Sequence, residues 1–122
     1  MRVSWQGRTF DLKTVWMEGP SVRMVDQRHL PNELQIFVAE SYADVAAAIR
    51  DMVVRGAPAI GAAAAYGMAQ AVLLGAEPEE AAEALRATRP TGHDLFHAIE
   101  YMLHAIGRGE SAVQAAAAFA DM

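Results

Sequence analysis

Apolar and polar residues alternate with a period of two over the first forty positions, which is the pattern of short β-strands. Turn-forming residues such as Gly19 and Pro20 separate the alternating runs. The runs expected to be extended are Val3–Trp5, Thr9–Lys13, Val22–Asp26 and Leu34–Val38. This spacing predicts a small antiparallel sheet of about four short strands.

The period changes to that of a helix at Ser41, where Ser41 and Asp44 form a capping box. Apolar residues at helical spacing then continue to about Val54, where we expect the first helix to end. Four further helices are expected to begin near Pro58, Pro78, Thr91 and Ser111, and Gly75 and Pro90 are expected to close the second and third. The pattern predicts an α+β fold in which a β-sheet subdomain (1–40) and a bundle of about five helices (41–122) form one N-terminal domain.

The second helix carries no formal charge between Pro58 and Leu74, so we expect it to be buried. It also contains Gly61 and Gly67, although a glycine inside a helix costs about 1 kcal/mol relative to alanine. Two glycines in one helix, in spite of this cost, predict that another backbone approaches the helix closely at these positions.

Composition excludes several classes of function. The net charge of −5 comes without a basic cluster, which argues against a nucleic-acid partner. The absence of cysteine excludes disulfides, thiolate metal sites and thiol nucleophiles from this chain. The first residues lack the apolar core of a signal peptide, and the uncharged stretch 56–74 fits a core helix better than a membrane span. We therefore expect a cytoplasmic protein without a membrane partner.

The last helix has no stop signal, because Ala115–Ala120 runs into the final two residues without a glycine, proline or basic turn. This favours a chain that continues into something else. A frayed natural terminus is the alternative.

Candidate chemistry is concentrated in the turn Arg55-Gly56-Ala57-Pro58. A helix start exposes backbone N–H groups and the positive end of the helix dipole, and an arginine fork matches phosphate oxygens. The alternative interpretation is purely structural: Arg55-Gly56 ends one helix, Pro58 begins the next, and the Arg55 side chain is solvated. Arg89 precedes the expected helix start at Thr91, so a second arginine lies beside a second helix N-terminus. This strengthens the prediction of a phosphate site.

His93, His97 and His104 share one face of the fourth predicted helix, and two histidines four residues apart can bind a metal. No further ligand stands out, so a polar helix face is the preferred interpretation and we expect no metal. The chain also contains no recognisable Ser/His/Asp arrangement, dinucleotide fingerprint or P-loop.

The run Met52–Gly67, with Asp26–Arg28 before it and Arg89–Thr91 after it, closely resembles one family. This is the methylthioribose-1-phosphate isomerase family, which is shared with the regulatory subunits of translation initiation factor 2B and with ribose-1,5-bisphosphate isomerase. The resemblance covers practically the whole chain and keeps the motifs in order.

The resemblance implies a sugar-phosphate substrate, aldose–ketose isomerisation in methionine salvage, and no metal or cofactor. It implies that Arg55, Gly56, Ala57 and Arg89 bind substrate. It also implies a Rossmann-like C-terminal domain, with a catalytic cysteine and aspartate, that is absent from this chain. We therefore expect no catalytic residue here, no activity of the chain alone, and a partner that is either a separate C-terminal chain or another copy.

Three identities remain open at this stage: a fragment, a split subunit and a degenerate stand-alone protein. The alternative functions are a regulatory or assembly domain like those of initiation factor 2B, and part of a ribose-1,5-bisphosphate isomerase. Gly92-His93-Asp94 departs from the Ala-Val-Asn that usually follows Arg-Pro-Thr in the isomerases. An anionic Asp94 beside a phosphate is unfavourable unless it faces away or pairs with an arginine.

Overall fold

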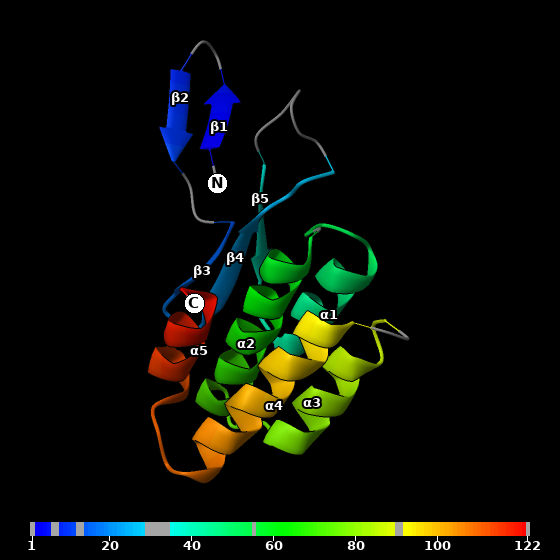
Figure 1. The fold of residues 1–122 in the computed structure, drawn as a ribbon, viewed down its shortest axis with the longest axis vertical. Coiled ribbons are helices and arrows are strands. Elements are labelled where there is room, and N and C mark those ends of the chain that lie inside the picture. The colour runs from blue at the N-terminus through cyan, green and yellow to red at the C-terminus, as the bar shows by residue number, and fades with distance from the viewer. Residues whose placement is uncertain are drawn as a thin grey trace.

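The chain forms an α+β fold in which a small antiparallel sheet lies beside five helices (Figure 1). The computed structural model describes residues 2–5, 8–11, 14–28, 35–54, 56–89 and 92–121. Its elements are β1 (Arg2–Trp5), β2 (Arg8–Asp11), β3 (Val15–Glu18), β4 (Ser21–Val25), β5 (Ile36–Ala39), α1 (Tyr42–Arg50), α2 (Ala57–Leu73), α3 (Pro78–Arg86), α4 (His93–Gly107) and α5 (Ala112–Ala120).

The described strands form two antiparallel sheets rather than one. β1 pairs with β2, and β3, β4 and β5 pair in that order. The third strand, β3, was not among the predicted runs, because its sequence Val-Trp-Met-Glu does not alternate between apolar and polar residues. The antiparallel arrangement is confirmed. The described residues form five strands, one more than the predicted number of about four.

The β3–β4–β5 sheet packs one face on the helices. Val22 and Met24 of β4 are fully buried, as is Ala39, which pairs with Val22 across the strands. Ile36 and Val38 share the opposite face and remain about 40% exposed. Their alternation was predicted correctly, but the pairing with β4 turns this apolar pair away from the helical core.

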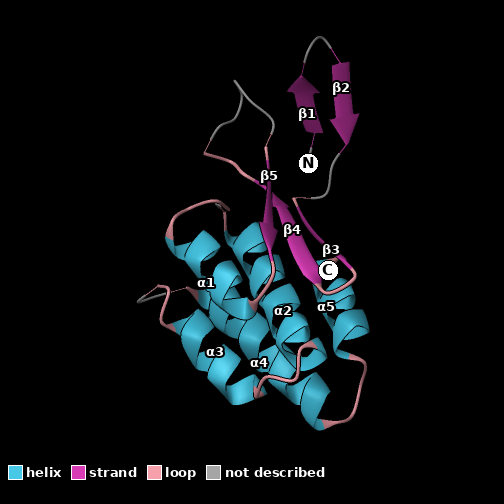
Figure 2. Ribbon diagram, turned by 180° about the vertical axis from the view of Figure 1, so that it is seen from behind, coloured by secondary structure: helices cyan, strands magenta, loops and turns pink. Residues whose placement is uncertain are grey.

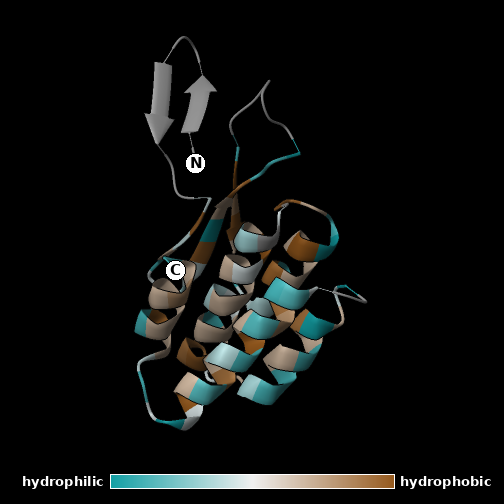
Figure 3. Ribbon diagram, viewed as in Figure 1, coloured by the Kyte–Doolittle hydropathy of each residue, from teal (hydrophilic) through white to brown (hydrophobic). Residues whose placement is uncertain are grey.

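α2 is the centre of the fold. It contacts all four other helices as well as β3 and β4, and its residues from Ile60 to Ala71 are buried on every side. Figure 2 shows the sheet on one side of α2, with α3 and α4 on the other. The outward faces of α3 and α4 are hydrophilic (Figure 3), as expected for helices that cover an apolar core. No helix in the described part of the chain has the length and apolar character that a membrane span requires.

A buried glutamine joins α2 to the sheet. Gln70 is fully buried, and its Nε2 donates hydrogen bonds of 2.8 Å to the carbonyl oxygens of Pro20 and Ala39. These acceptors lie at the β3–β4 turn and at the end of β5. One side chain therefore fixes the position of the sheet on the central helix.

Several predicted helix ends differ from the structure. α1 ends at Arg50 rather than near Val54, and α3 ends at Arg86, before Pro90. The capping box at Thr91 was wrong, because Gly92 is the N-cap of α4 and no side chain caps that helix. The Ser41 and Ser111 caps are confirmed, since each hydroxyl accepts from the backbone N–H three residues ahead. Thr91 itself lies outside the described residues.

The C-terminus of α1 holds an unusual residue at its left-handed position. Met52 has φ of 62° and follows the helix with the bonds Met52 N–Ile49 O and Val53 N–Ala48 O, which form a Schellman motif. α2 and α4 end in the same motif, but Gly75 and Gly109 occupy the equivalent positions there. Methionine at this position costs about 1–2 kcal/mol that glycine avoids.

We therefore expect Met52→Gly to raise the free energy of unfolding by about 1 kcal/mol, since Met52 is 48% exposed and loses little packing. Urea denaturation monitored by circular dichroism measures the change. Gly109→Ala is the matched control, because it places a β-carbon at the same backbone position and should destabilise by a similar amount. An unchanged midpoint for Met52→Gly would show that the left-handed turn carries no strain.

Candidate functional site

The turn between α1 and α2 is held by the segment that follows β4. The backbone N–H of Gln27 donates to the carbonyl oxygen of Val53 at 2.8 Å, two residues before Arg55. Asp26 is buried and pairs with Arg28 through both carboxylate oxygens, at 3.0 and 2.7 Å. These hydrogen bonds raise the pKa of Arg28 above its ordinary value. The Asp26–Arg28 segment therefore fixes the position of Val53, which lies just before the Arg55–Ala57 turn in the sequence.

α2 begins without a side-chain cap. Its N-cap is Gly56, whose φ of 88° and ψ of 137° lie in a region that favours glycine. The first helical bond runs from the Ile60 N–H to the Gly56 carbonyl, so the N–H groups of Ala57 and Ala59 have no partner within the helix. Pro58 carries no N–H. The start of α2 therefore offers unpaired donors and the positive end of a helix of 17 residues.

The start of α4 lies against the first turns of α2. A β-carbon on Gly61 would stand 3.3 Å from the carbonyl oxygen of Asp94 and 3.7 Å from its Cβ. This is the backbone approach predicted for Gly61, whereas Gly67 makes room for the side chains of Val45 and Leu85. α4 also begins at a glycine, Gly92, with no side-chain cap. Two uncapped helix N-termini therefore meet at one end of the bundle.

Two charged side chains flank these N-termini. Arg89 is half-buried, three residues before Gly92, and no acidic group lies within ion-pair distance of it among the described residues. Asp94, at the second position of α4, has its carboxylate 3.7 Å from His93 Nδ1. Its side chain is 44% exposed. Of the predicted site residues, the structure places Gly56, Ala57 and Arg89, while Arg55 lies outside the described residues.

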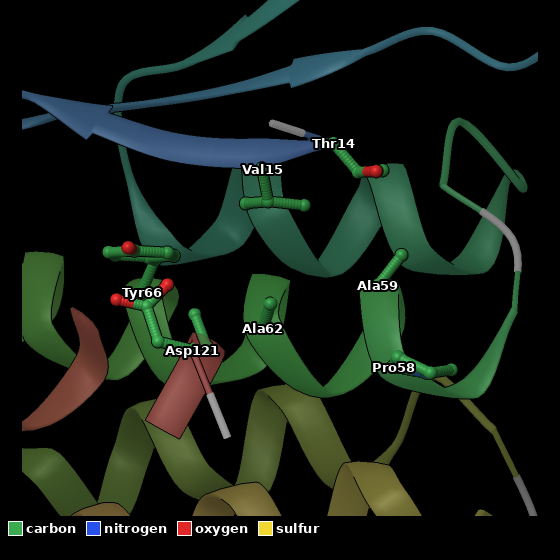
Figure 4. Close-up of a pocket in the computed structure, with 8 residues that line it drawn as sticks. Thr14, Val15, Pro58, Ala59, Ala62, Tyr66 and Asp121 are labelled. Carbon is green, nitrogen blue, oxygen red and sulfur yellow. The ribbon is translucent and has the colours of Figure 1, made fainter. Parts of the chain in front are cut away.

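A pocket of about 180 Å³ opens along the same turns of α2. Figure 4 shows Pro58, Ala59 and Thr14 at one end, and Tyr66 with Asp121 at the other. Its remaining walls are Val15, Ala62 and Ala120, so β3, α2 and α5 all contribute. This pocket was not predicted from the sequence. The signal available was Tyr66 itself, a polar ring inside a run of alanine and glycine.

Tyr66 is 5% exposed as a whole residue, and its hydroxyl, which makes no hydrogen bond within the described residues, remains accessible to solvent. Burial raises the pKa of Tyr66 above its ordinary value of 10.0, and the negative charge of Asp121 raises it further. The hydroxyl therefore remains protonated in the folded protein over the whole neutral and mildly alkaline range, and it stays a hydrogen-bond donor.

This shift predicts a loss of stability at high pH. The unfolded chain releases the Tyr66 proton near pH 10, whereas the folded chain retains it to a higher pH. The contribution of Tyr66 to the free energy of unfolding should therefore be constant below about pH 10 and decline above it, by at most about 1.4 kcal/mol per pH unit. Urea denaturation at several pH values measures this decline, and Tyr66→Phe should remove that part of it. An identical alkaline decline in the variant would refute the prediction.

The histidines of α4 do not assemble a metal centre with other described residues. The rings of His93 and His97 are 6.0 Å apart, and His97 packs edge-on against Phe119 at 5.6 Å. Within the described ranges, no three histidine or carboxylate side chains converge as metal ligands do. The contact with Phe119 gives His97 a packing role between α4 and α5.

The chain is similar in sequence to proteins named methylthioribose-1-phosphate isomerase. The chain is 53% identical over 79 residues to the methylthioribose-1-phosphate isomerase of Thermus thermophilus (65% of this chain, 24% of the relative). It is 40% identical over 107 residues to that of Aquifex aeolicus (87% and 24%). No family model matches the chain.

Two solved structures share the fold. The 5-methylthioribose 1-phosphate isomerase of Pyrococcus horikoshii matches with a TM-score of 0.79 and 35% identity, over 89% of this chain and 36% of that one. The delta subunit of translation initiation factor 2B from A. fulgidus matches with a TM-score of 0.77 and 33% identity, over 91% and 36%. The chain spans only about a quarter to a third of the length of the curated relatives it matches.

Proposed function

Because this chain belongs to the family of the methylthioribose-1-phosphate isomerases, which includes the delta subunit of initiation factor 2B, we propose that it carries the phosphate-binding half of such an isomerase. Arg55, Gly56, Ala57 and Arg89 would hold the phosphate of methylthioribose 1-phosphate. The reaction is the conversion of this aldose into its ketose in methionine salvage, in the cytoplasm.

The observation that carries the proposal is the meeting of two uncapped helix N-termini at Gly61 and Asp94. Each supplies backbone donors and a positive dipole end, so a phosphate between them receives hydrogen bonds from two directions. Arg89 adds a cation without a competing ion pair in the described residues. Arg55 directly precedes Gly56 in the sequence, and an arginine guanidinium has the fork of donors that phosphate oxygens accept.

The described residues supply binding rather than bond chemistry. Isomerisation of a sugar phosphate needs groups that open the ring and then move a proton or hydride between the first two carbons. In the described residues, Asp94 is the only acid in the first turns of α2 and α4, and its carboxylate lies 3.7 Å from His93 Nδ1. We propose that the catalytic groups come from a further segment, since the relatives are roughly two and a half to four times as long as this chain.

Calorimetry of the 122-residue chain with methylthioribose 1-phosphate tests the phosphate site. Arg55→Ala should weaken binding at least about tenfold, since a charged hydrogen bond contributes about 1.5–3 kcal/mol. Arg89→Ala should act in the same direction. Arg108→Ala is the matched control, because Arg108 lies at the C-terminal end of α4, opposite its start, and pairs with Glu110. Unchanged affinity in the Arg55 and Arg89 variants would overturn the phosphate site.

Catalysis is tested by complementation. The chain alone should not isomerise methylthioribose 1-phosphate, whereas its mixture with the remaining part of the Aquifex aeolicus enzyme should. Size-exclusion chromatography first establishes that the two parts associate. A folded complex without activity would refute the enzymatic assignment and favour a regulatory or assembly role, as the similarity to the initiation factor 2B subunit suggests.

A further inference from the structure

The first turn of α4 carries a negative charge of its own. Asp94 is the acidic residue in that turn, and no side chain caps the helix at Gly92. The first helical bond of α4 runs from the Phe96 N–H to the Gly92 carbonyl, so the earlier N–H groups have no partner within the helix. A carboxylate in a first turn interacts favourably with the positive end of the helix dipole. Asp94 therefore already supplies the kind of charge that this helix start attracts.

The charge of Asp94 lies close to the starts of both α2 and α4. A β-carbon on Gly61 would stand 3.7 Å from Asp94 Cβ, and the carboxylate is one bond beyond that atom. Gly61 is four residues from Ala57 at the start of α2, about 6 Å along the axis at 1.5 Å per residue. A phosphate between the two N-termini therefore comes within roughly 10 Å of the carboxylate, which is the Debye length at about 0.1 M salt.

No arginine neutralises Asp94 in the part of the chain that the structure describes. Its carboxylate is 3.7 Å from His93 Nδ1, and neither an arginine nor a lysine of the described ranges lies within ion-pair distance of it. Arg89 before α4 and Asp94 within it carry opposite formal charges, which cancel. The pairing that would make an acid harmless beside a phosphate is thus absent from the described residues.

We infer that Asp94 is a specificity-determining residue, an internal anion that competes with phosphate for the two helix N-termini. This rests on the proposed function of the phosphate site. Coulomb repulsion scales with the charge of the ligand, so Asp94 disfavours a doubly charged phosphate monoester more strongly than a singly charged phosphodiester. Asp94 therefore lowers the affinity of the site for a dianion and narrows the advantage of a dianion over a monoanion.

Calorimetry of the 122-residue chain with methyl phosphate and dimethyl phosphate tests this inference. At about pH 8 the first probe is a dianion, because the second pKa of a phosphate monoester is about 6, and the second probe is a monoanion. Asp94→Asn should bind methyl phosphate about fivefold more tightly than the wild-type chain, and dimethyl phosphate about twofold. Both gains should shrink at about 1 M salt, where the Debye length falls to about 3 Å.

Glu79→Gln is the matched control. Glu79 is also an acid in a first turn, that of α3, which begins just beyond the far end of α2 (Figure 1). The 17 residues of α2 separate this position from the phosphate site by about 25 Å, more than two Debye lengths. Both substitutions remove one carboxylate from a helix start, so both should lower the midpoint of thermal denaturation slightly. Only Asp94→Asn should change the affinity for methyl phosphate.

The possible outcomes separate this inference from the phosphate site itself. Equal methyl phosphate affinity in Asp94→Asn and in the wild-type chain overturns the competition and leaves the phosphate site intact. An equal gain in Glu79→Gln also overturns it, since net charge rather than position would be responsible. Equal gains for the two probes overturn a competition based on charge. If neither protein binds methyl phosphate, the phosphate site fails and this inference fails with it.

Discussion

Replacing Gln70 with leucine is expected to lower the free energy of unfolding by about 3 kcal/mol. The Gln70 Nε2 group donates to the carbonyl oxygens of Pro20 and Ala39, both at 2.8 Å. Leucine has a similar volume but no donor, so both carbonyls lose their partner. Each unpaired buried acceptor costs about 1–3 kcal/mol, and partial access of water to Pro20 moderates the sum.

Urea denaturation of Gln70→Leu measures this change. Gln114→Leu is the matched control, because Gln114 lies exposed on α5 and its side chain makes no hydrogen bond to a described residue. The control should change stability by less than about 0.5 kcal/mol. Equal stability of the two variants would mean that apolar packing alone holds the sheet on α2.

Gly61→Val is expected to be comparably disruptive, with a loss of about 3 kcal/mol. A β-carbon at residue 61 stands 3.3 Å from both the Asp94 carbonyl oxygen and the ring of Phe119. The first neighbour is backbone, so relief requires α4 to move away from α2, and overpacking of this kind costs about 1–3 kcal/mol or more. The same movement separates the two helix N-termini and should weaken phosphate binding.

Gly107→Ala is the matched control for this substitution. It also replaces a helical glycine, but its added β-carbon meets nothing within 4 Å. Alanine should therefore stabilise α4 by up to about 1 kcal/mol through helix propensity. Thermal denaturation and phosphate calorimetry compare the two variants. Full stability and full phosphate affinity in Gly61→Val would contradict the close approach of the helices.

Part of the site follows from local sequence. Gly56 at the start of α2 and Arg89 before α4 were recognised because a glycine turn, a helix start and an arginine are features of neighbouring residues. The Gly61 approach was also predictable, since a helical glycine without local purpose indicates a close neighbour. The identity of that neighbour, the carbonyl of Asp94, was not.

Other features of the fold and of the pocket could not be predicted from residues that are neighbours in the sequence. The pocket joins Thr14, Tyr66 and Asp121, which are separated by about fifty residues or more along the chain. α4 begins at the N-cap Gly92, which the capping-box pattern at Thr91 did not predict. The outward direction of Ile36 and Val38 depends on the register between β4 and β5.

The sequence by itself determined the order of the five helices and the buried, uncharged character of α2, and it is the source of the proposal that the Arg55-Gly56-Ala57 turn binds phosphate. Periodicity, capping and propensity act between residues a few positions apart, so they can be read along the chain. Only the tertiary structure decided that the starts of α2 and α4 meet at Gly61, and that β3, α2 and α5 leave a pocket ending at Tyr66. Those features depend on packing between distant segments, where the shape of the whole core sets each contact.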